Sequence, residues 1–406
     1  MEKIKVSIVK CDSYEKDVIK PALDKCLENL NGFEDIIKQD LKILLKPNLL
    51  SPNEPEKAIT THPLFLEAII NKIISITNKP ENILIADSCV PVLSYSKKGL
   101  QKLYDITGLI SLSERTGVKL NYDTKTKIIS VKDGIAVKQL EIIKPAYDAD
   151  IIINVPKFKT HNLTIMTGAI KNMFGIIPGM AKPGYHTRFF DLDMFCNLLI
   201  DIIIAVKPTI NIMDGILGME GQGPGRGGNP RKTNMILASY DPFALDNIAA
   251  NIMGLNEDNN PIMVQAKNRK IYGSNLNDIK IVGGDLRDFL ILDFKLPLFN
   301  KKVENENKIL KFVKNFAKNS LNPYPYFNYE KCNYCKTCYE VCPQNAIILK
   351  NNDNDVKISK NKKILSFNYN KCIRCFCCAE ACPEGAIESK YNFIGNLIIN
   401  KYGKGK

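Results

Sequence analysis

The sequence lacks a hydrophobic run long enough to cross a membrane, and it has only three histidines among its 406 residues. Its longest apolar run, 198–206, is interrupted by Asp201 and is much shorter than the roughly 20 residues that a spanning helix needs. The first residues, MEKIKVSIVK, alternate apolar and polar positions, which is typical of a strand and not of a signal peptide. We therefore expect a cytoplasmic protein without a transmembrane segment.

Motifs for nucleotide cofactors and for nucleic acids are also missing. No Walker A sequence and no G-x-G-x-x-G followed by a clear helix occurs, which disfavours nicotinamide-dependent hydride transfer but leaves a flavin open. The lysines behind the formal net charge of +13 are scattered, and no nucleic-acid-binding motif accompanies them. The charge therefore favours an anionic substrate or an acidic protein partner over nucleic acid.

What the sequence does have is cysteine in a doubled pattern. Each copy reads C-x2-C-x2-C-x3-C-P, a spacing typical of bacterial two-cluster ferredoxins, in which the fourth cysteine of each run ligates the other cluster. We therefore predict two 4Fe–4S clusters with crossed ligands. The first cluster is assigned to Cys332, Cys335, Cys338 and Cys382, and the second to Cys372, Cys375, Cys378 and Cys342.

Zinc and disulfide bonds are the alternatives for so many cysteines. Zinc sites use paired ligands, whereas each copy here has three cysteines at two-residue intervals before its Cys-Pro. Disulfides are rare in a reducing cytoplasm. We expect this protein in such a cytoplasm, in the cell of an anaerobe. Cys377, beside the predicted ligand Cys378, is either a small buried filler or a residue that replaces a ligand or tunes a cluster.

The two copies form an internal repeat offset by forty residues. FNYEKCNYCKTCYEVCPQNAI, from Phe327, and FNYNKCIRCFCCAEACPEGAI, from Phe367, are identical at 12 of 21 positions, which indicates a duplication. Each copy is expected to have a short strand before its first cysteine and a strand or turn after its proline. The polar segment between the copies, KNNDNDVKISKNKK, is predicted to be a hairpin tip or a docking loop.

The first 290 residues alternate strand-like and helix-like patterns, as in a doubly wound sheet. Helices are predicted at 17–30, 63–76 and 191–205, with Thr61 as the N-cap of the second. We predict an α/β fold in which a mostly parallel doubly wound sheet is followed by a small ferredoxin-like α+β domain. The predicted boundaries are 1–296 for the α/β domain, 297–324 for a linker helix, 325–392 for the ferredoxin domain and 393–406 for a tail.

Five predicted strands of the α/β domain end in polar residues. In open α/β sheets, ligands bind beyond the carboxyl ends of the strands, so these endings predict a shared site. The residues are Lys46, Asn48, Asp87, Ser88, Lys157, Lys159, His161, Asp214 and Asp241. Two glycine-rich stretches, 167–179 and 215–228, are expected to reach the same edge. They form either an anion cradle of exposed N–H groups or a flexible lid or tight turn.

The three histidines lie on segments assigned to this edge. His62 and His161 fall at predicted strand-to-helix junctions, and His186 falls in a loop. A lone histidine in a loop is usually without special function, but three on one edge favour a functional role. A histidine or a lysine at this edge would be suited to deliver protons.

Six stretches resemble the motifs of the domain-of-unknown-function family 362, namely KPNLL, TTHP, KFKTH, GAIKNMFG, MDGILGMEGQGPG and ASYDPFALD. The resemblance covers about residues 4–290, and members of that family commonly carry a C-terminal two-cluster ferredoxin module. It implies an iron–sulfur protein of redox function and supplies no substrate. One departure is Cys89-Val90-Pro91, where family members often have a glycine-rich turn. The matching positions are Lys46, Asn48, His62, Lys159, His161, Lys171, Asn172, Asp214, Glu220 and Asp241.

Together, the cysteine repeat and the resemblance predict an iron–sulfur protein whose clusters relay electrons to an anionic substrate in the α/β domain, with a ferredoxin or reductase as redox partner. Catalytic roles are predicted for His161, Lys159, Lys171 and Asp214. Anion contacts are predicted for Lys46, Asn48, His62, Lys157, Asn172, His186, Glu220 and Asp241. The alternative is a non-catalytic electron carrier or a partner in Fe–S maturation or redox sensing. A deep pocket beside one cluster favours the enzyme, and a flat surface favours the carrier.

Overall fold

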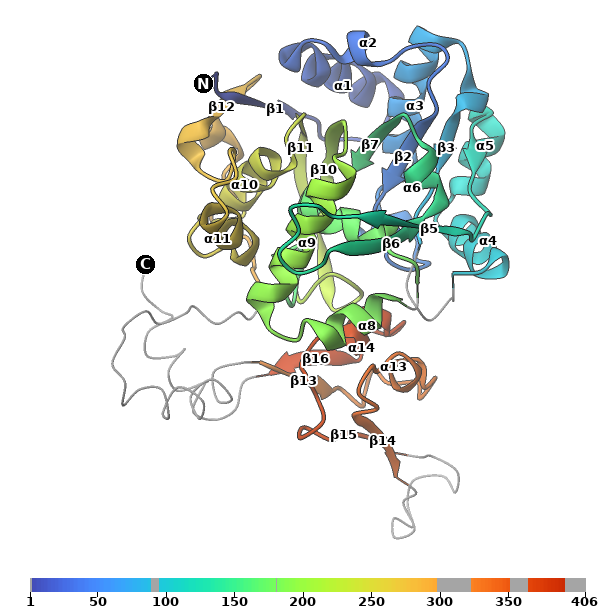
Figure 1. The fold of residues 1–406 in the computed structure, drawn as a ribbon, viewed down its shortest axis with the longest axis vertical. Coiled ribbons are helices and arrows are strands. Elements are labelled where there is room, and N and C mark those ends of the chain that lie inside the picture. Colours follow the sequence, from blue (N-terminus) through green and yellow to red (C-terminus); the bar gives the residue numbers. More distant parts are fainter. Residues whose placement is uncertain (1, 89–94, 180, 298–322, 351–363, 391–406) are drawn as a thin grey trace.

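The computed structural model describes residues 2–88, 95–179, 181–297, 323–350 and 364–390. Residues up to 297 form an α/β unit, and the two C-terminal segments form a smaller cysteine module that lies against one end of it (Figure 1). Some predicted features lie outside the described residues, namely 298–322 of the linker helix, the tail 393–406, Cys89-Val90-Pro91 and most of the polar segment between the copies.

A ten-stranded sheet forms the centre of the α/β unit. Its main path runs in the order β12 (Ile279–Val282), β1 (Ile4–Lys10), β11 (Gly228–Ser239), β10 (Ile210–Gly221), β7 (Ile151–Val155), β2 (Ile43–Pro47), β3 (Ile83–Ile85) and β4 (Lys119–Leu120). Off this path, β8 (Lys157–His161) pairs with β10, and β9 (Ile165–Met166) pairs with β8. From β10 to β4 every pair on this path is parallel, and β11 pairs antiparallel with both β10 and β1. The predicted α/β fold with a mostly parallel sheet is confirmed.

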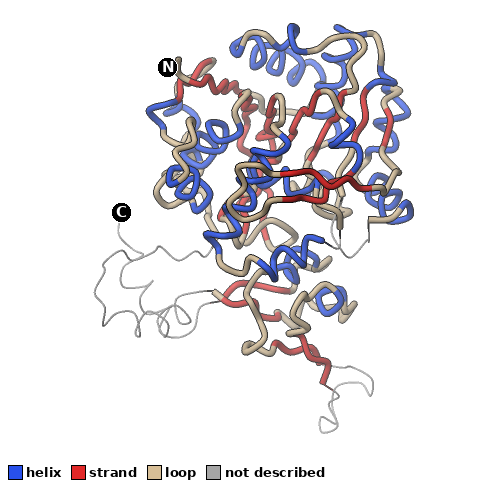
Figure 2. Tube along the Cα trace, in the orientation of Figure 1, coloured by secondary structure: helices blue, strands red, loops and turns tan. Residues whose placement is uncertain are grey.

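Helices cover both faces of the sheet, as Figure 2 shows. One face carries α1 (Lys16–Leu30), α2 (Phe33–Ile36), α3 (Pro63–Thr77), α4 (Lys97–Ile106) and α5 (Leu109–Thr116), and the other carries α6 (Lys144–Asp148), α7 (Gly168–Asn172), α8 (Ala181–Arg188), α9 (Leu192–Val206), α10 (Pro242–Ile252) and α11 (Pro261–Asn268). Neighbouring strand residues point to opposite faces. Leu45 accordingly packs in the core with α1 and α3, and Leu44 packs in the core with α9.

The predicted helices are present within one residue of their expected ends, and one cap differs. The N-cap of α3 is His62, whose ring nitrogen Nδ1 accepts a hydrogen bond from the N–H of Leu64 at 3.2 Å. Thr61, the predicted cap, instead donates its hydroxyl to the carbonyl of Val155 at 2.7 Å and thereby ties α3 to β7. Within the described residues, no helix is long and apolar enough to span a bilayer.

A two-stranded hairpin, β5 (Thr126–Ser130) and β6 (Gln139–Ile143), lies over the α9 side of the sheet. Asp201 of α9 holds its turn, because this buried carboxylate accepts hydrogen bonds from the N–H groups of Ile135, Ala136 and Val137 at 2.7–3.0 Å. Arg269 neutralises the carboxylate at 2.7 Å. Asp201, the residue that interrupts the longest apolar run, is therefore a structural anchor.

The cysteine module repeats its conformation as it repeats its sequence. β13 (Tyr324–Phe327) pairs antiparallel with β16 (Ile387–Lys390), and β14 (Ile347–Lys350) pairs antiparallel with β15 (Ile364–Phe367). The short helices are α13 (Thr337–Glu340) and α14 (Cys377–Ala381). Equivalent residues of the two copies adopt positive φ, for example Asn345 at 46° and Gly385 at 58°. The strands expected around each cysteine run are present.

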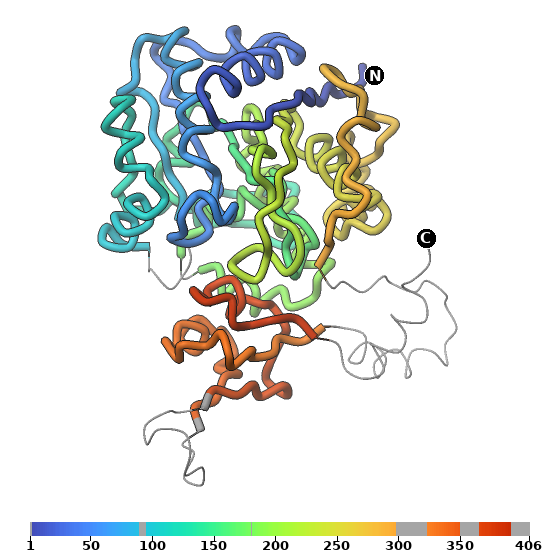
Figure 3. Tube along the Cα trace, turned by 180° about the vertical axis from the view of Figure 1, so that it is seen from behind, coloured from blue at the N-terminus to red at the C-terminus, as the bar shows by residue number. Residues whose placement is uncertain are grey.

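The β10–β11 hairpin carries the second glycine-rich stretch to the cysteine module (Figure 3). A Cβ atom on Gly225 would lie 3.3 Å from the Glu380 carbonyl oxygen, and one on Gly385 would lie 2.6 Å from the Arg226 carbonyl oxygen. Glycine is therefore needed at position 385, and Gly225 fits closely, where the backbones of the hairpin tip and the module approach each other. Of the alternatives for this stretch, the structure supports the tight turn.

Replacing Gly385 with asparagine tests this contact. Asn345 holds a positive φ at the equivalent position of the first copy, so asparagine tolerates the backbone conformation. The added side chain must still displace the Arg226 carbonyl, and we expect the hairpin tip to lose its support. Hydrogen–deuterium exchange over residues 221–228 should become at least about tenfold faster. The matched control, Asn345→Gly, should leave it unchanged, and equal exchange in both variants would contradict the contact.

Candidate functional site

A cleft separates the carboxyl ends of β2, β3 and β8 from helix α14 of the cysteine module, and it holds about 700 Å³ of empty space, part of it open to solvent. Figure 1 shows α8 and α14 side by side at this boundary. The polar lining from the α/β unit consists of Asn48, Asp87, Lys159, His161, Thr167, Lys171, Asn172, Lys182 and His186. The cysteine module contributes Val341, Cys377, Glu380 and Ala381.

His161 and Glu380 meet across the cleft. Nδ1 of His161 accepts hydrogen bonds from the N–H groups of Leu163 and Thr164 at 3.0 and 3.3 Å, so the ring proton lies on Nε2. Nε2 is 2.9 Å from Oε1 of Glu380, although the two groups are not aligned as a good hydrogen bond. Burial and the positive charge of Lys171 together lower the pKa of His161 to about 4, although Glu380 opposes this shift. His161 is therefore neutral at neutral pH.

Glu380, from helix α14 of the cysteine module, contributes a carboxylate to the cleft lining. Burial alone would raise the pKa of Glu380, but the contact with His161 and the positive charge of Lys171 outweigh it and hold the pKa below its usual range. The side chain is 12% exposed, whereas its counterpart Glu340 in the first copy is exposed. Of these two equivalent glutamates, only Glu380 therefore presents a largely buried carboxylate to the α/β unit.

Two lysines of the cleft lack a close carboxylate partner among the described residues. Lys159 donates hydrogen bonds from Nζ to the carbonyls of Ile59 and Pro224 at 2.6 and 3.3 Å, and burial lowers its pKa to about 7 although Glu380 opposes this shift. Nζ of Lys171 lies 5.1 Å from the ring centre of Phe174, and burial lowers its pKa too. An anion in the cleft would supply the missing negative charge.

The other two predicted lysines are already neutralised. Nζ of Lys46 lies 2.6 Å from Oδ2 of Asp87, and Nζ of Lys157 lies 2.6 Å from Oδ2 of Asp214. Both pairs are buried, with the side chains of Lys157 and Asp214 fully inaccessible. A buried ion pair that is broken leaves an uncompensated charge, so these residues hold the strand ends in place.

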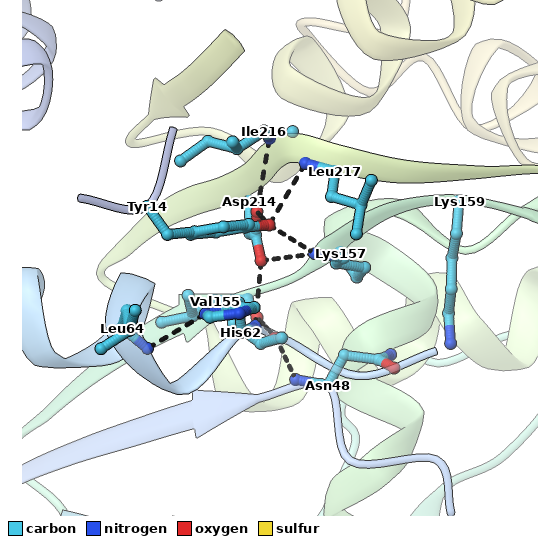
Figure 4. A network of polar contacts seen from close by, with 12 residues as sticks. Tyr14, Asn48, His62, Leu64, Val155, Lys157, Lys159, Asp214, Ile216 and Leu217 are labelled. Carbon is cyan, nitrogen blue, oxygen red and sulfur yellow. Dashed lines mark hydrogen bonds and ion pairs between the residues drawn. The ribbon is translucent and has the colours of Figure 1, made fainter. Parts of the chain in front are cut away.

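The Lys157–Asp214 pair belongs to a polar network of its own (Figure 4). Oδ1 of Asp214 accepts a hydrogen bond from the Tyr14 hydroxyl at 2.8 Å, and Oδ2 accepts one from the N–H of His62 at 3.0 Å. The rings of Tyr14 and His62 stack with 3.7 Å between their centres. None of these four side chains lines the cleft in the described part of the chain. The network fixes the start of α3 against β8 and β10.

The remaining predicted residues are placed as follows. His186 was predicted in a loop but lies on helix α8 in the cleft wall, where it stacks on Phe195 and burial lowers its pKa to about 3. Asp241 is the N-cap of α10, and Glu220 accepts a hydrogen bond from the N–H of Lys295 at 3.2 Å. The structure thus brings together in the cleft Asn48, Lys159, His161, Lys171, Asn172 and His186. It places outside the cleft lining Lys46, His62, Lys157, Asp214, Glu220 and Asp241.

Sequence reasoning missed Glu380 and Thr167, which both line the cleft. Glu380 has an identical counterpart in Glu340, so the repeat carries no signal that only one of them faces the α/β unit. Thr167 is the first residue of the first glycine-rich stretch, for which the glycines alone suggested a function. Its hydroxyl is buried and has no hydrogen-bond partner among the described residues.

The cysteines of the module gather in two groups. A second cavity is lined by Cys342, Cys372, Cys375 and Cys378. Burial and the neighbouring sulfurs of Cys382, Cys332 and Cys335 together raise the pKa of Cys338 to about 12. The N–H groups of Ala346 and Ala386 donate to the sulfurs of Cys342 and Cys382, both at 3.2 Å. Thiolates with such N–H bonds are the donor set that 4Fe–4S clusters use, so the residues fit cluster binding.

Cys377 connects the cleft with these cysteines. It is buried, lines the cleft, and its thiol forms a hydrogen bond with Cys375 that lowers the pKa of Cys375. In the first copy, Thr337 takes the equivalent place, with its hydroxyl oxygen 3.3 Å from the sulfur of Cys335. Of the alternatives for Cys377, this contact supports the one in which it modifies a neighbouring cluster ligand.

Comparison with known proteins gives two family matches. Residues 43–251 match the family described as Domain of unknown function (DUF362), and residues 324–383 match the family described as 4Fe-4S dicluster domain. The Thylakoid-associated protein sll1697 of Synechocystis sp. is 30% identical over 293 residues, which are 72% of this chain and 87% of that protein. The second match identifies an iron–sulfur protein with a 4Fe–4S-binding domain suited to electron transfer.

The buried pair behind the cleft yields a stability prediction. Lys157→Met leaves Asp214 buried without its cation, and we expect a loss of about 3–5 kcal/mol in the free energy of unfolding, measured with urea. The control is Lys79→Met, which breaks the exposed pair with Asp40 and should change stability little. A loss for Lys157→Met no larger than that of the control would show that the pair does not stabilise the strand ends.

Proposed function

The chain belongs to the DUF362 family, and from that premise we propose that it is an iron–sulfur oxidoreductase that binds an anionic small molecule in the cleft and exchanges electrons with it. The observation that carries the proposal is the composition of the cleft. Lys159 and Lys171 lie on its α/β side, and Cys377 and Glu380 of the cysteine module close it. The redox-active part of the protein and an anion-binding wall thus share one cavity.

We assign two clusters with crossed ligands to the module. Cys332, Cys335, Cys338 and Cys382 would hold the first, and Cys372, Cys375, Cys378 and Cys342 the second. The cavity lined by Cys342, Cys372, Cys375 and Cys378 supports the second set, and the thiolates around Cys338 support the first. When bound, such clusters supply single electrons. Cys335 is exposed, so a redox partner protein would have access to the first group of cysteines.

Each cleft residue has a role in this proposal. Lys171, buried and without a close carboxylate partner among the described residues, binds the anion through charge-assisted hydrogen bonds. Lys159, whose pKa is about 7, can hold or release a proton on the bound molecule near neutral pH. His161 and Glu380 position the cysteine module against the α/β unit and exclude water from the anion. Low polarity around these groups strengthens their interactions with the bound anion.

The carrier alternative would require a flat docking surface at the strand ends. The cleft favours the enzyme, because Lys159 and Lys171 line a hollow that a flat protein surface cannot fill. The cytoplasmic location remains part of the proposal. The name of the similar protein from Synechocystis sp. associates that protein with the thylakoid and says nothing about the location of this chain.

The test is the pH dependence of anion binding to the anaerobically prepared full chain, measured by calorimetry with succinate. The positive charge of Lys159 is present below its pKa of about 7, so succinate should bind more tightly as the pH falls through 7. The charged groups that act on Lys159 are Glu380, Lys171, Lys157 and Asp87. Lys159→Met should reduce the pH dependence, and Lys171→Met should weaken binding about ten- to a hundredfold at pH 6, where a lysine with a lowered pKa is most fully charged.

Two controls accompany the binding measurement. Every variant should retain the iron content of the wild type, about eight atoms per chain for two clusters. Lys280→Met, a change at an exposed lysine of β12, should leave succinate binding unaltered. Unchanged affinity in both the Lys159 and the Lys171 variant would contradict the anion site and move the function to the electron carrier.

A further inference from the structure

Four buried asparagines form a continuous chain of amide hydrogen bonds that ends at the cleft. Nδ2 of Asn48 donates to Oδ1 of Asn172 at 2.9 Å, and Nδ2 of Asn172 donates to Oδ1 of Asn154 at 2.7 Å. Nδ2 of Asn154 in turn donates to Oδ1 of Asn211 at 2.8 Å. The chain crosses from the end of β2 through α7 and β7 to β10.

Backbone carbonyls fix the direction of this chain. Nδ2 of Asn211 also faces the carbonyl of Ser239 at 3.3 Å, and Nδ2 of Asn154 faces the carbonyl of Ala169 at 3.0 Å. Nδ2 of Asn172 likewise faces the carbonyl of Lys46 at 3.1 Å. A carbonyl oxygen only accepts hydrogen bonds, so each of these three amides must present its NH₂ group to it. The three amides cannot be reversed without placing oxygen against oxygen.

The fixed direction determines what the chain presents to the cleft. Oδ1 of Asn172 needs a hydrogen-bond donor, and the NH₂ group of Asn48 provides it. Oδ1 of Asn48 is therefore the atom at the cleft end of the chain. Oδ1 of Asn48 is buried and has no hydrogen-bond partner in the described part of the protein, although Asn48, 7% exposed, lines the cleft. In Figure 4 the amide of Asn48 extends to the side on which the ammonium of Lys159 lies. A buried acceptor without a donor is unfavourable, so this oxygen is suited to a donor on a ligand.

We propose that the ligand of the cleft is an anion that also carries a hydrogen-bond donor, a hydroxyl or amino group, which it donates to Oδ1 of Asn48. The anionic group meets Lys159 and Lys171, and the donor meets Asn48, so hydroxy or amino carboxylates are the class of ligand that fits. This inference rests on the proposed anion-binding function of the cleft. An anion that has no donor, or that offers only a carbonyl, leaves Oδ1 of Asn48 unpaired.

Matched pairs of small anions test the donor. A site built around a hydrogen bond rejects an analogue that lacks the bonding group, since its own polar atom then stays unpaired. We expect the anaerobic full-length protein to bind glycolate about ten- to a hundredfold more tightly than acetate, and malate more tightly than succinate by a similar factor. Calorimetry at one pH and ionic strength gives both dissociation constants.

Two variants assign the effect to its atoms. Asn48→Ala removes the acceptor, so the ratio of the two affinities should fall to about one, with acetate binding little changed. Lys171→Met removes the cation, so the protein should bind both anions of a pair more weakly by the same factor. The ratio of the two affinities should therefore stay as in the wild type. Iron content and thermal unfolding check that each variant is folded. If Asn48→Ala does not fold, the ratio of the glycolate and acetate affinities of the wild type tests the inference by itself.

The outcomes separate the two proposals. Equal binding of glycolate and acetate by the wild type, with both weakened in Lys171→Met, would overturn the donor inference and leave the anion site intact. A preference for glycolate that survives in Asn48→Ala would also overturn it, because another residue would then receive the donor. No binding of any of the four anions would contradict the anion-binding function, and the inference would fall with it.

Discussion

The structure depends on the burial of positive charge without a close negative partner. Transferring an ammonium group from water into a protein interior is unfavourable unless a counter-charge or hydrogen bonds compensate for it. Lys46 and Lys157 have such counter-charges in Asp87 and Asp214, and these pairs hold the strand ends together. Lys159 and Lys171 have no carboxylate at ion-pair distance among the described residues, and they face the same cleft. The fold thus maintains a positive wall that a bound anion would complete.

The cysteine module makes this wall into a cavity. The tip of the β10–β11 hairpin, with Gly225, supports α14, which carries both Glu380 and Cys377. Among the described residues, Glu380 provides the one carboxylate that reaches His161, and Cys377 touches a predicted cluster ligand from the cleft side. Opposite them, the asparagine chain that ends at Asn48 gives the cavity a fixed acceptor. Binding, orientation and electron supply would therefore meet in one place.

Much of the fold could be predicted from the sequence, because apolar runs such as ILLK and the cysteine repeat are local patterns. The polar endings of the predicted strands also led to four of the residues that line the cleft, namely Asn48, Asp87, Lys159 and His161, and the family resemblance added Lys171 and Asn172. The strand endings could not distinguish them from Lys157, whose charge is cancelled by Asp214, since that pairing joins residues far apart in the chain. Glu380 was missed for the same reason. Its environment comes from docking against the α/β unit, and its counterpart Glu340 has the same local sequence.

The central claim is that an anion binds next to a cluster, and pulsed electron paramagnetic resonance measures this directly. The full chain is reduced anaerobically, saturated with carbon-13-labelled malate and frozen. The account predicts a magnetic coupling between the reduced cluster and the labelled carbons. Lys171→Met, which weakens malate binding, should reduce the coupling at a malate concentration that only just saturates the wild type, while the spectrum of the cluster itself persists. Saturating malate without any such coupling in the wild type would contradict the account, because the anion would then bind elsewhere.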